Sequence, residues 1–174
     1  MIHTNTSYKY LTVISLGFII FILDYWELTD PFTNEILLFG ISAAKSVYFI
    51  GYTFSNIRES AEREFYFHEF VPFVALSVLL IVLSFGLDYF CLYQINPKAF
   101  AGEFRSPHLA ETFLTFLYFS ATTFTTAGLG DITPGSASAR IFVMLELFIA
   151  FFFTILIISN ITHIRESFAQ KSKK

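Results

Sequence analysis

The chain is poor in charged residues and nearly devoid of cysteine, and both shortages limit its function. Lysine, arginine, aspartate and glutamate make up 14% of its 174 residues, whereas a typical soluble domain has about 25%. A single cysteine, Cys91, excludes an intrachain disulfide and a cysteine-based zinc site. The net charge of −3 provides no basic face, so no nucleic-acid partner is expected.

Hydrophobic residues, in contrast, are abundant. They make up 55% of the chain, and 24 residues are phenylalanine, which would leave a water-soluble fold with too little polar surface. Four stretches, residues 8–26, 36–54, 72–95 and 137–161, have about the length that crosses a bilayer as a helix. A fifth, Leu109 to Phe124, is too short and too polar to cross. The sequence therefore predicts an all-α integral membrane protein with four transmembrane helices.

The lysine and arginine residues set the expected orientation. The connection after the first span contains neither, whereas Arg58 and Arg63 follow the second span. Four more cations follow the last span: Arg165, Lys171, Lys173 and Lys174. We therefore expect both termini in the cytoplasm, in a plasma or bacterial inner membrane, with the loop between the third and fourth spans outside.

The most informative run follows the fifth apolar stretch, where a threonine cluster leads into two alternate glycines, Gly128 and Gly130. Alternate glycines permit left-handed backbone angles, so successive carbonyl oxygens can face one axis and replace the hydration shell of an ion. Non-helical backbone inside a membrane is tolerated only where it lines such a path. The partial negative charge at the C-terminus of a preceding helix would favour a cation.

Residues 126–131, Thr-Ala-Gly-Leu-Gly-Asp, resemble the selectivity filter of potassium channels, whose typical form is Thr-Val-Gly-Tyr-Gly-Asp. The order helix, pore helix, filter and helix is similar to the two-helix pore module of that family. The resemblance implies a re-entrant pore helix and K⁺ ions in the filter, with no other cofactor. Because one filter strand cannot enclose an ion, it also implies a homotetramer in membrane lipid. The residues that would bind the ions are Thr126, Ala127, Gly128, Leu129 and Gly130.

The spans and this resemblance divide the chain into four segments. Residues 1–57 are expected to form an N-terminal transmembrane hairpin, and residues 58–71 a linker helix at the inner membrane surface. Residues 72–162 correspond to the pore domain, with Pro72 in the first turn of its first helix, where its missing N–H costs nothing. Residues 163–174 form a short basic cytoplasmic tail.

Other residues of the pore domain gain expected roles from the family. Asp131 would lie at the outer mouth, where Tyr118 either hydrogen-bonds it and stiffens the filter or simply packs. By spacing from the filter, the cavity-facing residues of the last helix would be Phe151, Thr154 and Ile158. Phe151 is either a hydrophobic gate or an ordinary packing residue.

Two charged residues lie inside predicted spans. Lys45 is near the middle of the second span, where a lone charge is costly, so it should pair with Asp24, Asp88 or Glu146, as a structural ion pair or as a sensor charge. Glu146 is expected against the pore helix, either in a satisfied hydrogen bond or as a proton sensor. A voltage sensor needs several regularly spaced cations, so the hairpin is interpreted as a scaffold.

The filter departs from the family pattern at two positions, which leaves its ion selectivity open. Ala127 replaces valine or isoleucine, and Leu129 replaces tyrosine or phenylalanine, although leucine occurs there in some two-pore-domain potassium channels. The sequence predicts a passive, potassium-selective channel. The alternatives are a weakly selective Na⁺/K⁺ channel of the same fold and a non-conducting accessory pore subunit. An enzyme is not expected, because the chain has no Gly-x-Ser-x-Gly or His-Glu-x-x-His motif.

Overall fold

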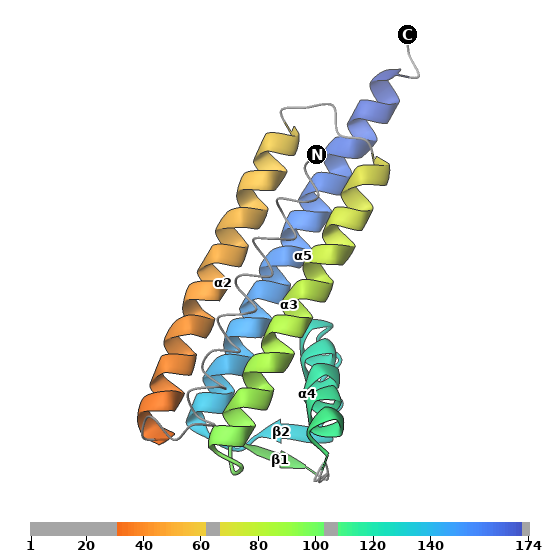
Figure 1. The fold of residues 1–174 in the computed structure, drawn as a ribbon. Helices are drawn as coiled ribbons and strands as arrows, with labels where there is room; N and C mark the ends of the chain where they lie inside the picture. Colours follow the sequence, from red (N-terminus) through yellow and green to blue (C-terminus); the bar gives the residue numbers. More distant parts are fainter. Residues whose placement is uncertain (1–30, 62–66, 103–107, 172–174) are drawn as a thin grey trace.

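A computed structural model describes residues 31–61, 67–102 and 108–171. They form four helices and two short strands: α2 (Pro31–Ala61), α3 (Phe67–Ile95), β1 (Phe100–Gly102), α4 (Leu109–Phe124), β2 (Ile132–Pro134) and α5 (Ala137–Lys171). Helices α2, α3 and α5 run side by side as long rods, while the shorter α4 lies along one end of α3, close to the strands (Figure 1). The first predicted span, residues 8–26, lies outside the described residues.

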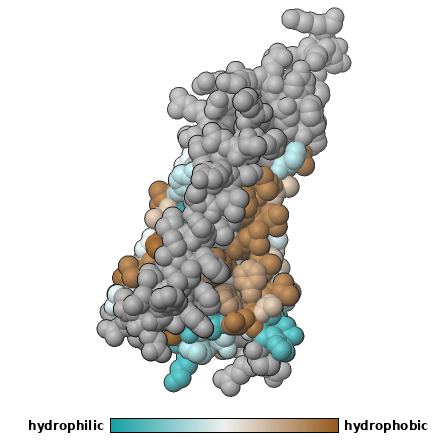
Figure 2. Space-filling model, viewed as in Figure 1, coloured by the Kyte–Doolittle hydropathy of each residue, from teal (hydrophilic) through white to brown (hydrophobic). Residues whose placement is uncertain are grey.

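Two of the described helices contain a stretch long and apolar enough to cross a membrane. These stretches, Val74–Ile95 and Ala137–Ser159, coincide with the predicted third and fourth spans. Helix α2 is 31 residues long, but its apolar part, Ile36–Gly51, is shorter, so a crossing by α2 stays a prediction. Apolar side chains form a broad band over the described part of one face, and hydrophilic ones gather at the end where the strands lie (Figure 2).

The helices around the predicted linker are longer than the sequence suggested. Residues 58–61 are the end of α2 and residues 67–71 are the start of α3, so the described part of 58–71 is not a separate helix. No glycine or proline interrupts residues 52–61, which lets α2 continue. Pro72 lies inside α3 instead of in its first turn. A proline at this position removes the hydrogen bond to the carbonyl oxygen of residue 68, and its ring crowds that carbonyl group.

Helix α4 packs one face against α3 and α5. Its buried residues recur at helical spacing and form a single stripe: Thr112, Phe116, Phe119, Ser120 and Thr123. At Gly86 of α3 the two backbones approach closely, because a Cβ atom there would lie 3.0 Å from the Cα of Leu117. Small residues permit such contact between membrane helices.

Aromatic rings fill the space between α3, α4 and β1. The ring of Phe100 on β1 lies 5.0 Å from that of Phe116 and 5.6 Å from those of Tyr89 and Phe119. Tyr89 and Phe119 are 5.0 Å apart in an edge-to-face arrangement, a favourable geometry for aromatic pairs. This cluster fixes the end of α3 to α4 and to the first strand.

The two strands bring distant parts of the chain to one end of the molecule. They pair antiparallel, with Phe100 opposite Pro134 and Gly102 opposite Ile132. Because β1 follows α3 and β2 precedes α5, the intervening chain leaves this end along α4 and returns to it. Such an excursion is the geometry expected of a pore loop. The strands themselves were not predicted.

Candidate functional site

The turn after α4 directs its backbone N–H groups back toward the helix. The N–H of Thr126 donates to the carbonyl oxygen of Thr123 at 2.9 Å. The N–H groups of Ala127 and Gly128 both donate to the carbonyl oxygen of Thr122, at 2.9 and 3.3 Å. The orphan carbonyls that end every α-helix therefore bind the N–H groups of the following residues.

The backbone then alternates in handedness. Thr126, Gly128 and Gly130 have positive φ angles of 56°, 51° and 81°, whereas Ala127 and Leu129 do not. Positive φ was expected at the two glycines only. In Thr126 it is a strained conformation that costs of the order of 1–3 kcal/mol, and the hydrogen bonds of the turn hold it there. This alternation lets successive carbonyl groups of residues 126–130 face the same side of the backbone. We call this segment, which is not a β-strand, the carbonyl-lined strand.

The carbonyl oxygens of this strand are available to a ligand. Residues 125–131 are all exposed. Within the described part of the chain, no hydrogen bond is donated to a carbonyl oxygen of residues 126–130. A row of unpaired carbonyl dipoles is the ligand set that replaces water around a monovalent cation. By contrast, no cluster of three or more His, Cys, Asp or Glu side chains suited to a metal ion occurs among the described residues.

A side-chain hydrogen bond joins Asp131, which follows the carbonyl-lined strand, to α4. The hydroxyl of Tyr118 donates a hydrogen bond to Oδ2 of Asp131 at 2.8 Å. Of the two alternatives for Tyr118, the structure has the hydrogen bond. Whether this contact stiffens a filter stays a prediction.

The three predicted cavity-facing residues of α5 are all exposed in the single chain. Phe151 and Ile158 are exposed to 66% and 61%, and the hydroxyl of Thr154 bonds back to the carbonyl oxygen of Ala150 at 2.9 Å. Large apolar residues at alternating spacings of three and four form one exposed stripe along α5: Ile141, Met144, Phe148, Phe151, Ile155 and Ile158. A cavity would form only between neighbouring copies of the chain. The cavity-facing role of these three residues therefore stays a prediction.

Behind α4, a buried hydrogen-bonded group joins three helices. Glu146 of α5 accepts hydrogen bonds from Ser120 of α4 at 2.5 Å and from Tyr89 of α3 at 2.6 Å. All three side chains are fully buried. The predicted position of Glu146, hydrogen-bonded against the pore helix, is confirmed. Tyr89 and Ser120 were not predicted as its partners, because residues so far apart in the chain give no spacing signal.

Lys45 forms a buried ion pair with Asp88 of α3, with Nζ 2.5 Å from Oδ1. The hydroxyl of Ser42 donates to the other oxygen, Oδ2, at 2.8 Å. Asp88 was one of three partners expected for Lys45. Glu146 has different partners, and Asp24 lies outside the described residues. The structural ion pair is therefore confirmed, whereas a sensor role for Lys45 stays a prediction.

Two helices, the excursion between them and the carbonyl-lined strand define a pore-forming membrane module. A family model described as an ion channel matches residues 75–166. The match covers more than half of the chain, which therefore belongs to this ion channel family and carries a potassium-channel-like pore module. No curated protein and no solved structure matches the chain closely enough to refine this assignment.

Proposed function

We propose that four copies of the chain surround one axis and conduct K⁺ passively and selectively through the strand of residues 126–130. The alternating backbone of this strand carries the proposal, because it leaves a row of exposed, unpaired carbonyl oxygens. Such oxygens can replace the hydration shell of K⁺. One strand per chain surrounds an ion on one side only, so identical neighbours must supply the other sides.

In this tetramer the filter, the residues beside it and the exposed stripe of α5 have different roles. The carbonyl oxygens of residues 126–130 and the hydroxyl of Thr126 coordinate the ions. The hydrogen bond from Tyr118 to Asp131 supports the outer end of the filter. The exposed stripe of α5, which includes Phe151 and Ile158, lines the water-filled cavity and contacts neighbouring copies. Both termini then lie in the cytoplasm of a plasma or bacterial inner membrane.

A weakly selective Na⁺/K⁺ channel is the second candidate function. Ala127 and Leu129 are both exposed in the chain. Ala127 is smaller than the valine or isoleucine typical of potassium channels, and Leu129 lacks the aromatic ring of the usual tyrosine or phenylalanine. A less tightly packed filter adapts to more than one ion. A non-conducting accessory subunit is the third candidate.

The reversal potential of the purified protein in planar bilayers separates these functions. With K⁺ on one side and Na⁺ on the other, a value near the potassium equilibrium potential is expected. A value near zero with clear current would instead establish the weakly selective channel. No current from protein that assembles as a tetramer would identify an accessory subunit and overturn the proposal.

A further inference from the structure

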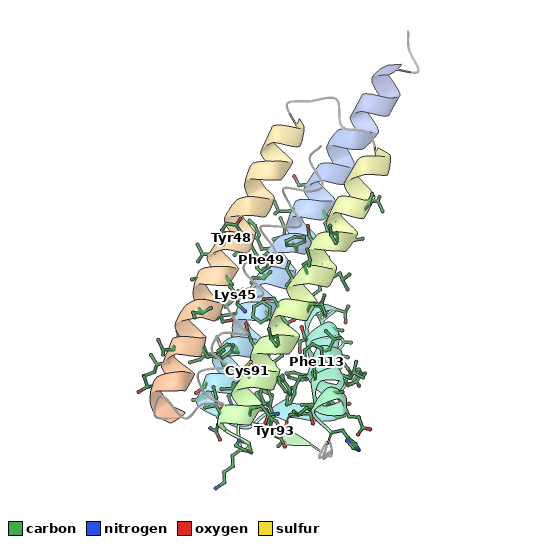
Figure 3. All side chains as sticks on the ribbon, viewed as in Figure 1. Lys45, Tyr48, Phe49, Cys91, Tyr93 and Phe113 are labelled. Atoms are coloured by element: carbon green, nitrogen blue, oxygen red, sulfur yellow. The ribbon has the colours of Figure 1, made fainter. Side chains whose placement is uncertain are left out.

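Helix α2 lies outside the residues matched by the channel family, yet one of its charges is buried in the pore module. Lys45 is 4% exposed, and its partner Asp88 is 1% exposed. Lys45 lies on α2 at mid-length, on the side that faces α3 (Figure 3). Ser42 satisfies the second carboxylate oxygen of Asp88 at 2.8 Å. The pore module therefore contains a carboxylate whose partners both come from α2.

Inside a membrane, Asp88 depends strongly on its partners from α2. Asp88 lies within the apolar stretch Val74–Ile95, where a charged side chain without a partner is costly. Removing one member of a buried ion pair leaves such a charge behind. Helix α2 also contacts α5, where the rings of Phe39 and Phe142 meet edge to face at 6.0 Å. Helix α2 thus packs against the pore module and contacts both α3 and α5.

The residue after Asp88 reaches the pore helix through hydrogen bonds. Tyr89 donates to Glu146 at 2.6 Å, and Ser120 of α4 donates to the other carboxylate oxygen at 2.5 Å. Because Asp88 and Tyr89 are consecutive on one helix, a rotation of α3 that moves the first also moves the second.

We propose that Lys45 is a positioning residue of the pore. By fixing Asp88, Lys45 sets the rotation of α3, and through Tyr89 and Glu146 it sets the position of α4. The C-terminal turn of α4 holds the backbone of Thr126 and Ala127, so the position of α4 determines that of the carbonyl-lined strand. The proposal rests on the chain forming a channel, and it does not depend on which cation the channel selects.

Hydrogen–deuterium exchange of the full-length protein in lipid nanodiscs tests this directly. The single variant Lys45→Met leaves Asp88 unpaired and is expected to accumulate poorly. The double variant Lys45→Met/Asp88→Asn removes both charges together, which buried ion pairs often tolerate. In this variant the amides of residues 119–131 should exchange faster by about ten-fold.

The matched control is Val47→Leu, at an exposed position of the same helix, which should leave exchange in residues 119–131 unchanged. Faster exchange confined to α2 and α3 in the double variant would overturn the proposal. This readout needs no current and no selectivity, so its outcome is independent of whether the channel prefers K⁺.

Open probability in planar bilayers provides a second measurement. Lys45→Met/Asp88→Asn and Ser120→Ala should each change open probability, and their combination should change it no further than the larger single effect. Residues of one connected group behave in this non-additive way. Effects that multiply would show that Lys45 and Ser120 act independently, and an unchanged open probability in the charge-free variant would equally overturn the proposal.

Discussion

The two sides of α4 differ in burial and in how many of their polar groups find hydrogen-bond partners within one chain. The back of the helix is buried, and its polar groups have partners in the same chain: Ser120 contacts Glu146 at 2.5 Å and the carbonyl oxygen of Val82 at 3.0 Å. The front is exposed, with Tyr118 at 40% and Leu114 at 61%. The strand that follows α4 keeps its carbonyl oxygens without a hydrogen-bond donor among the described residues.

In the proposed tetramer, this difference separates the contacts that one chain makes by itself from those that neighbouring chains would add. Buried polar groups in a membrane need partners within the protein, and the back of α4 has them. At the front, the carbonyl oxygens of residues 126–130 have no hydrogen-bond donor among the described residues, and in the proposed tetramer ions, water or neighbouring copies would satisfy them. We therefore expect changes at the back to affect mainly folding, and changes at the front to affect mainly ion conduction.

The largest effect is expected from Gly128→Ala, which alters the front alone. A side chain at a φ of 51° is strained, at a cost of about 1–2 kcal/mol in each subunit. Over the four subunits of the proposed tetramer, this should lower the cation flux into liposomes by about a thousand-fold or more. The control is Gly40→Ala, where an added Cβ meets nothing within 4 Å, and which should conduct normally. Full flux in Gly128→Ala would show that this backbone does not line the conduction path.

The next effect is expected from Glu146→Leu, which alters the back. Tyr89 then loses the acceptor of its buried hydroxyl, which costs about 1–3 kcal/mol. The midpoint of thermal unfolding in detergent should fall accordingly. Glu146→Gln is the matched control, because its amide can still accept from Tyr89 and donate to Ser120. Equal midpoints for the leucine variant and the wild type would contradict the structural role of this group.

Gly86→Ala should have a smaller effect at the back. The added Cβ would lie 3.0 Å from the Cα of Leu117, and such overpacking costs about 1–3 kcal/mol. The better helix propensity of alanine offsets up to about 1 kcal/mol of that. We expect a modestly lower unfolding midpoint, whereas Gly40→Ala should unfold at or above the wild-type temperature. A stabilised Gly86→Ala variant would mean that α4 moves aside freely.

The smallest effect on folding is expected from Tyr118→Phe, which removes the hydrogen bond between Tyr118 and Asp131 at the front. The hydroxyl and Asp131 are both exposed, so the unfolding midpoint should not change. If the bond supports the filter, current should decline about two- to ten-fold faster during sustained opening. A decline at the wild-type rate would mean that the strand holds its shape through its backbone alone.

Local patterns in the sequence were enough to predict several parts of the pore module. Helix α4 occupies the predicted stretch Leu109–Phe124, because an apolar run between turn-forming residues marks its own ends. Positive φ at Gly128 and Gly130 also follows from residue type. A lysine inside an apolar stretch required a partner, and the partner, Asp88, was among the three residues considered.

Contacts between distant segments were not predictable in the same way. Strands β1 and β2 have three residues each, too few for an alternating pattern to appear. Gly86 contacts Leu117 because α3 and α4 pack closely at this point, and no local sequence pattern marks such a contact. The positive φ of Thr126 contradicts the usual preference of its residue type, and it is imposed by the turn that ends α4.

The sequence by itself determined that the chain belongs in a membrane and where its two alternate glycines interrupt the helices, because composition, hydrophobic length and glycine spacing are properties of the chain alone. Only the tertiary structure decided which polar groups meet behind α4. The three helices that contribute Tyr89, Ser120 and Glu146 must pack before those side chains come within hydrogen-bond distance. The pairing of Lys45 with Asp88 rather than Glu146 was decided in the same way, by the face that α2 presents to α3.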